Sequence, residues 1–130
     1  MKYWLPVLLW MGIIFIFSAQ PSLPSLPFAT ADTILKKAGH FTEYAVLATL
    51  SVRAISAGHP LRRGDLWRAL LLTLLYAASD EFHQSFVPGR TASLWDWLVD
   101  ALGAGLALLA ISRRWRRGEA FASQKQRLPG

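Results

Sequence analysis

The sequence contains no cysteine, and this absence removes several kinds of chemistry at once. Without thiols the chain cannot form a disulfide framework, a thiolate metal site or a cysteine nucleophile. The sequence also lacks a Walker loop, a dinucleotide-binding fingerprint and the spacing of a Ser/His/Asp hydrolase. Any reaction carried out by this protein must therefore use His, carboxylate, Lys or Arg side chains.

Charged residues are scarce as well, at 17% of the 130 residues, whereas hydrophobic residues make up 53%. This composition is more apolar than that of most soluble domains and indicates a membrane protein. The net charge of +6 does not indicate nucleic acid, because the arginines are grouped in "RRGDLWR" and "SRRWRRG", each beside an apolar run. We therefore predict a single membrane domain and no nucleic-acid partner.

Long apolar runs divide the chain into membrane-spanning segments. A helix that crosses the hydrocarbon core needs about 20 mostly apolar residues, fewer where aromatic residues mark its ends. The alternative for the first run is a signal peptide, but Phe17 is a poor residue just before a cut that follows Ala19. Four spans are predicted, at residues 3–19, 38–57, 66–86 and 94–112.

The connections are marked by residues that interrupt helices. The segment "QPSLPSLPFATAD" is rich in proline and is predicted to be an extended loop, and "VPGR" forms the turn between the last two spans. The predicted fold is all-α, an integral membrane bundle of four transmembrane helices within residues 1–117. Residues 118–130 are polar and are predicted to form a disordered cytoplasmic tail.

Arginines in the short loops predict the orientation of the bundle. Cytoplasmic loops collect Lys and Arg, so the arginine-rich second connection and the C-terminus should both lie inside. The N- and C-termini are then cytoplasmic, while Lys36 and Lys37 lie on the opposite side and weigh against this orientation. The arginines that outnumber these two lysines are Arg53, Arg62, Arg63, Arg68, Arg113, Arg114, Arg116 and Arg117.

Polar side chains gather at the outer ends of the last three spans. At a rise of about 1.5 Å per residue, all of them fall within about 10 Å of the outer interface. Ionisable groups at membrane depth avoid lipid and pair inside the bundle, so we expect a polar pocket that opens outward. The set comprises Lys37, His40, Glu43 and Tyr44 of the second span, Asp80, Glu81, His83 and Gln84 of the third, Arg90 of the turn, and Asp96 and Asp100 of the fourth.

These side chains leave several readings open. His and carboxylate groups suit a divalent metal site, for which the candidates are His40, Glu43, Glu81 and His83, although the helical pair His-x-x-Glu is common by chance. The same groups together with Asp80 are candidates for acid–base catalysis. Without any reaction, a lipid head group or a peptide carboxylate could be bound by Lys37, Tyr44, Gln84, Arg90, Asp96 and Asp100. The bland alternative is a structural polar core with interfacial anchors.

Two stretches carry a resemblance to a known family. "KAGHFTEYAVL" and "YAASDEFHQSFVPGRTASLWDWLVDALGAGLA" resemble the VanZ-like family of small bacterial membrane proteins, and the likeness extends over about residues 33–107. The Asp-Glu-x-His-Gln block, followed by Pro-Gly-Arg and Asp-x-x-x-Asp, is its most specific part. The positions that match are the polar residues already collected above.

The resemblance implies a location and a field of function. It implies a multi-pass protein of the bacterial cytoplasmic membrane, and the family's namesake is associated with teicoplanin resistance through a mechanism that the resemblance does not supply. We expect an outward pocket that binds or processes an envelope lipid or a lipid-linked cell-wall precursor. The alternatives are a metal- or acid/base-dependent enzyme acting on a lipid head group, and a structural polar core. The small bundle also suggests a homo-oligomer.

Overall fold

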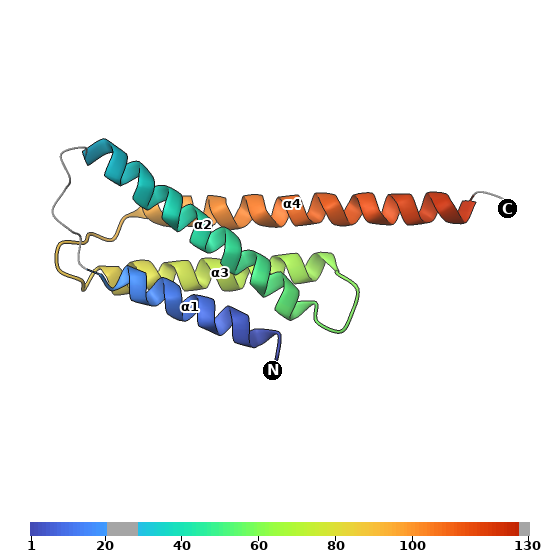
Figure 1. Cartoon of the computed structure of the whole chain (residues 1–130), viewed down its shortest axis with the longest axis horizontal. Coiled ribbons are helices and arrows are strands. Elements are labelled where there is room, and N and C mark those ends of the chain that lie inside the picture. Colours follow the sequence, from blue (N-terminus) through green and yellow to red (C-terminus); the bar gives the residue numbers. More distant parts are fainter. Residues whose placement is uncertain (21–28, 128–130) are drawn as a thin grey trace.

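Four helices make up the computed structural model, which describes residues 1–20 and 29–127. Successive helices run in opposite directions, so the chain termini point toward one end of the bundle (Figure 1). The described residues contain no strand, and the predicted all-α class is therefore confirmed. The helices are α1 (Trp4–Ser18), α2 (Ala29–Ile55), α3 (Arg63–Gln84) and α4 (Leu94–Arg127).

Two helices extend beyond their predicted bounds. Helix α2 begins at Ala29, inside the stretch predicted to be a loop, because residues 29–55 contain no proline to interrupt a helix. Residues 21–28 of that predicted loop lie outside the described residues. The prediction of a disordered tail differs from the structure, in which α4 continues to Arg127 through a sequence rich in good helix formers.

The length of α4 sets it apart from the other helices. Its 34 residues correspond to about 50 Å, well beyond the thickness of a hydrocarbon core. The last turns project past the rest of the bundle (Figure 1). In the described part of the chain, α4 is the one helix that is long and apolar enough to cross a membrane, and α1 is apolar but only 15 residues long.

Helix α2 is the centre of the bundle, because it contacts α1, α3 and α4. Its closest approach is to α4 at Gly103, where an added Cβ would lie 3.1 Å from the Cα of Phe41 and collide with its carbonyl oxygen. Gly105, two residues further along the same helix, has open space around the position of a Cβ. Gly103 therefore brings two helices together, and Gly105 lines a gap.

Helix α1 is held against α2 and α3 by two long-range hydrogen bonds. The indole Nε1 of Trp10 donates to the carbonyl oxygen of Glu43 at 2.9 Å. The hydroxyl of Tyr76 donates to the carbonyl oxygen of Met11 at 2.6 Å. Both acceptors belong to backbone groups inside helices, which can accept a second bond besides their helical one. One side chain of α1 and one of α3 thus help to fix the position of α1 against its two neighbours.

We expect Trp10→Phe to weaken the attachment of α1. The ring would still pack, but the bond to Glu43 would be lost, so the free energy of unfolding should fall by about 1 kcal/mol. The matched control is Trp95→Phe, since Trp95 is exposed and its indole makes no hydrogen bond among the described residues. Thermal unfolding of the two variants in detergent compares them, and equal midpoints would show that the Trp10 bond contributes nothing.

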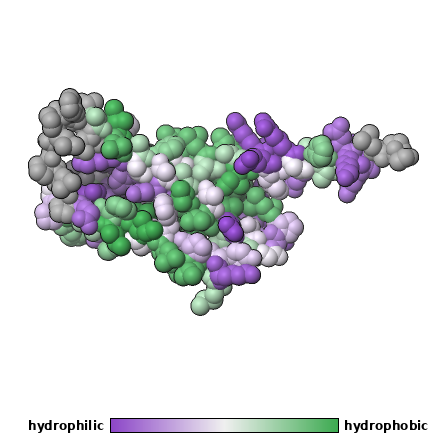
Figure 2. Space-filling view, in the orientation of Figure 1, coloured by the Kyte–Doolittle hydropathy of each residue, from purple (hydrophilic) through white to green (hydrophobic). Residues whose placement is uncertain are grey.

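The bundle buries two clusters of hydrophobic residues, but it also buries several polar side chains and exposes many large apolar ones. Large apolar side chains such as Leu8, Ile16 and Leu75 are exposed, whereas Asp80 and Asp100 are buried. Figure 2 shows hydrophobic surface over the middle of the bundle and hydrophilic surface toward its two ends. Buried carboxylates need hydrogen-bond or ion-pair partners. The polar groups that surround them at one end of the bundle are therefore the candidates for a functional site.

Candidate functional site

Asp80 is the centre of a buried network that joins three helices. Its Oδ2 accepts hydrogen bonds from the Tyr44 hydroxyl and from Nε2 of Gln84, both at 3.1 Å. Gln84 Nε2 also donates to Oγ of Ser18 at 2.7 Å. Since Ser18 ends α1, Tyr44 lies on α2 and the other two residues lie on α3, the network fixes these helices at one depth.

Helices α2 and α4 face each other through two pairs of opposite charge type. Nδ1 of His40 lies 3.4 Å from Oδ1 of Asp100, whose side chain is wholly buried. This approach is within ion-pair distance, but neither atom has a partner in hydrogen-bonding geometry. Nearer the surface, Nζ of Lys37 lies 4.0 Å from Oδ1 of Asp96. Asp96 and Asp100, spaced i, i+4 on α4, therefore lie opposite Lys37 and His40, which are three residues apart on α2.

Glu81 turns inward, toward the connection between α3 and α4. Its Oε2 accepts a hydrogen bond from the backbone N–H of Ser93 at 3.1 Å, while its Oε1 is buried without a partner. Helical spacing places Glu81 to one side of the face that carries Asp80. The hydrogen bond from Ser93, across the turn between α3 and α4, nevertheless brings the Glu81 side chain into the bundle. Glu81 thus ties the start of α4 to the end of α3.

Arg90 and His83 are both engaged with α1. Arg90 Nε donates to the carbonyl oxygen of Gln20 at 2.9 Å and Nη2 to that of Phe17 at 3.5 Å. These bonds add a side-chain donor at the C-terminal end of α1, where the carbonyl oxygen of Phe17 also accepts from the backbone N–H of Gln20 at 3.3 Å. His83 stacks on Phe15 with ring centroids 4.5 Å apart, and its Nδ1 is buried without a partner. Both residues help to position α1, whatever else they do.

Two small cavities open beside these residues. Their volumes are about 170 and 200 Å³, and Lys36, His40 and Arg90 line both. Glu43 lines one cavity, while Asp96 and Gln84 line the other. Spaces of this size hold a few waters or the charged end of a larger molecule, whose remainder would have to extend outside the bundle.

Among the described residues, no three His, Asp or Glu side chains lie close enough together to hold a metal ion. Of the four candidates, His40 approaches Asp100, Glu43 lines a cavity, Glu81 accepts from Ser93, and His83 stacks on α1. A zinc site needs three or four converging ligands. The divalent metal hypothesis stays a prediction that rests on residue type.

Some members of the site are not evident from the sequence. Ser18 is a small polar residue in an apolar run, and its role becomes visible only when it accepts from Gln84. Lys36 is not among the residues predicted to form the pocket, yet it lines both cavities. The signal that could have found them is the single polar interruption of α1 and the i, i+4 spacing of Lys36 and His40.

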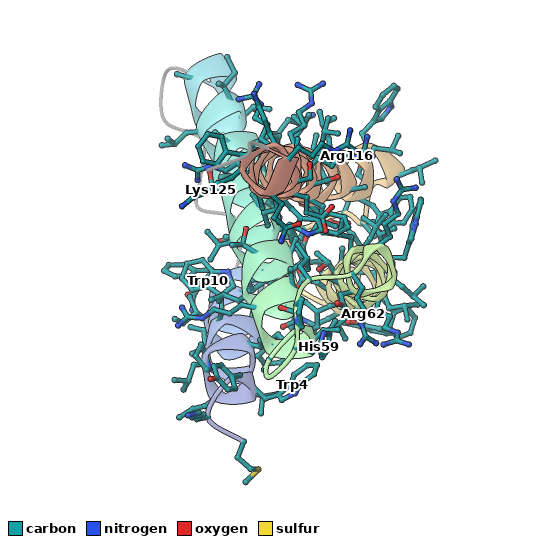
Figure 3. The ribbon with its side chains drawn as sticks, turned by 90° about the vertical axis from the view of Figure 1, so that its right-hand side faces the viewer. Trp4, Trp10, His59, Arg62, Arg116 and Lys125 are labelled. Atoms are coloured by element: carbon teal, nitrogen blue, oxygen red, sulfur yellow. The ribbon has the colours of Figure 1, made fainter. Side chains whose placement is uncertain are left out.

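A separate polar group lies at the opposite end of the bundle. Asp65 is buried, and its Oδ2 accepts a hydrogen bond from the backbone N–H of Arg62 at 2.9 Å. Nδ1 of His59 lies 3.7 Å from the same oxygen, and Nη1 of Arg68 lies 3.9 Å from Oδ1. Figure 3 shows His59 and Arg62 where the α2–α3 connection enters α3. This group closes the start of α3 and is structural.

One comparison with known proteins gives a match. A family model described as VanZ/LLP1 matches residues 3–115, which include α1, α2, α3 and the part of α4 that packs in the bundle. No curated protein and no solved structure matches the chain. The family match covers every residue of the candidate site and ends before the projecting turns of α4.

Proposed function

The chain belongs to the VanZ/LLP1 family, and from that premise we propose a four-span protein of the bacterial cytoplasmic membrane that binds an envelope lipid or a lipid-linked cell-wall precursor. Its pocket lies at the outer end of the bundle, among Lys36, Lys37, His40 and Arg90. The observation that carries the proposal is a polar core that opens to cavities at one end of a bundle with an apolar exterior.

The distribution of side chains supports the membrane placement of all four helices. Leu, Ile and Phe side chains are exposed on α1, α3 and α4, and in water such a surface would be a liability. Buried carboxylates such as Asp80 and Asp100 are explained if the exterior meets lipid, because polar groups at membrane depth turn toward one another. Arg-rich segments at the opposite end from the pocket support a cytoplasmic position for that end.

The charges around the cavities favour a phosphate group as the part of the ligand that is bound. Lys36, Lys37 and Arg90 supply positive charge and hydrogen-bond donors at the opening, where a membrane-surface phosphate would lie. The cavities are too small for a whole lipid, so its chains would remain in the bilayer. A polyprenyl phosphate combines a phosphate group with a long apolar chain, and it is the carrier in lipid-linked wall precursors.

One observation favours the enzymatic alternative for the same pocket. Asp100 lies beside Nδ1 of His40, and the negative charge of a carboxylate 3.4 Å away favours a proton on that nitrogen, although the two atoms do not meet in hydrogen-bonding geometry. The other ring nitrogen, Nε2, is then free to accept or donate a proton at the cavity that His40 lines. Such a pair would serve a lipid phosphate substrate as a general base or acid.

The test is binding of a polyprenyl phosphate to the purified full chain, compared with His40→Gln. Removing the imidazole from both cavities should weaken binding about tenfold, since a charge-assisted hydrogen bond contributes about 1.5–3 kcal/mol. His59→Gln is the matched control. His59 lies at the opposite end of the bundle, so this variant should bind polyprenyl phosphate as the parent does. Equal binding by both variants would remove the pocket from the proposal.

Asp100→Asn separates a binding protein from an enzyme. A binding site should retain the ligand, because Asp100 is buried behind His40 and does not line the cavities. An enzyme should bind but lose turnover, since the imidazole would no longer be held as a proton acceptor. Teicoplanin susceptibility of a sensitive host, at membrane levels matched by blot, reports whether the resistance association applies to this chain.

A further inference from the structure

A second groove lies between α3 and α4 at the end of the bundle opposite the candidate site. It has a volume of about 260 Å³ and shares no residue with the outer cavities. Along its length the side chains change from apolar to basic: Leu70 and Gly105 come first, Leu66 and Leu109 follow, and Arg63 and Arg116 come last. This order follows from the opposite directions of α3 and α4.

The two arginines indicate what the groove holds. Across residues 1–20 and 29–127, no ion pair joins Arg63 or Arg116 to a carboxylate, since the nearby Asp65 is approached by His59 and Arg68. Both side chains are exposed, and together they present positive charge to an anion that enters this end of the groove. Figure 3 shows Arg116 on α4 at the end of the bundle where α3 begins.

The apolar part of the groove has room for a chain. A Cβ added to Gly105 would meet no heavy atom within 4 Å, whereas one at Gly103 would collide with α2. Glycine at position 105 therefore leaves an open strip between α3 and α4, bordered by Leu66, Leu70 and Leu109. Trp67 lines the same groove and is largely exposed, as an aromatic residue at a membrane interface would be.

We infer that this groove binds an anionic phospholipid of the cytoplasmic leaflet. The phosphate lies between Arg63 and Arg116, and an acyl chain lies over Gly105. Basic pockets between transmembrane helices on the cytoplasmic side are suited to anionic head groups, and the positive-inside rule places this end there. The inference rests on the membrane placement in the proposed function and not on the ligand at the outer pocket.

Lipid-dependent thermal stability of the full chain tests the inference. The protein is purified in detergent, stripped of lipid and heated with phosphatidylglycerol, phosphatidylcholine or inorganic phosphate while Trp fluorescence is followed. Phosphatidylglycerol should raise the midpoint in a concentration-dependent way, because a ligand of the folded state stabilises it. The same concentrations of phosphatidylcholine or inorganic phosphate should have little effect.

Two variants locate the effect in the groove. Arg63→Gln combined with Arg116→Gln should weaken the apparent affinity for phosphatidylglycerol about 25-fold, at roughly fivefold for each arginine. Arg114→Gln combined with Arg117→Gln removes the same charge from residues outside the groove and should weaken it far less. Gly105→Leu should fill the open strip and abolish the stabilisation, while remaining at least as stable as the parent without lipid.

Several results would overturn the inference. Equal protection by phosphatidylcholine would remove the role of charge, and equal protection by inorganic phosphate would leave a soluble anion site. An equal loss in the control pair would indicate diffuse attraction to the surface. Retained stabilisation in Gly105→Leu would show that no chain lies in the groove, and this variant decides the matter if the arginine variants fold poorly. Any of these results with normal polyprenyl phosphate binding contradicts this inference alone.

Discussion

Replacing Gly103 by alanine should separate α2 from α4 and cause the largest loss of stability of any single methyl group added to this chain. The new Cβ would lie 3.0 Å from the carbonyl carbon of Phe41 and collide with its oxygen. Because the obstacle is backbone, no side-chain rotation can relieve it, and the helices must move. Overpacking of this kind costs about 1–3 kcal/mol. Thermal unfolding in detergent, with the yield of folded protein from membranes, measures the loss.

Gly105→Ala is the matched control for this prediction. It adds the same methyl group to the same helix, two residues away, where nothing lies within 4 Å. Replacing glycine by alanine in a helix also favours the helix by about 1 kcal/mol, so this variant should be at least as stable as the parent. If the two variants unfold at the same temperature, the contact between Gly103 and Phe41 does not determine the packing of the bundle.

Asp80→Ala should have an effect at least as large, through the hydrogen bonds that it removes. The Tyr44 hydroxyl would lose its acceptor, and Gln84 Nε2 would keep only the bond to Ser18. A buried donor without an acceptor costs about 1–3 kcal/mol, so the free energy of unfolding should fall by about 2–4 kcal/mol. Chemical or thermal unfolding of the purified chain in detergent gives this difference.

Asp80→Asn distinguishes the role of the oxygen atoms from that of the charge. The amide keeps one oxygen where Oδ2 accepts both bonds and places its nitrogen where Oδ1 already has no partner. This variant should therefore lose less than half as much stability as Asp80→Ala. An equal loss in both would mean that the carboxylate is needed as such. A folded Asp80→Asn protein that no longer binds polyprenyl phosphate would make Asp80 part of the site.

These predictions depend on the polar side chains that the bundle buries beside its hydrophobic core. The polar core is connected from Ser18 through Gln84 and Asp80 to Tyr44, and its second half consists of the pair His40 and Asp100. A connected polar network is costly to break at any one point, because each loss leaves a partner unsatisfied at low dielectric. Stability must therefore be measured for every variant before a loss of binding is assigned to the pocket.

Apolar and polar patterns in the sequence were sufficient to predict the four helices and the grouping of their polar residues. Apolar runs separated by Pro, Gly and Arg predict elements that correspond to α1, α2, α3 and α4. The helical period and the direction of each helix then place His40, Asp80 and Asp100 at one end of the bundle. The depth of a residue in an antiparallel bundle follows from its position along its helix. The spacing of Asp96 and Asp100 likewise indicates one face of α4.

The tertiary structure alone decided which of these residues meet. Helical spacing gives the face on which a side chain lies, but its partner depends on the crossing and rotation of neighbouring helices, which are set by packing at points such as Gly103. This is why Glu81 turns inward to Ser93, and why Arg90 binds the end of α1. The groove over Gly105 is likewise invisible in the sequence, since it exists only because α3 and α4 are held apart there.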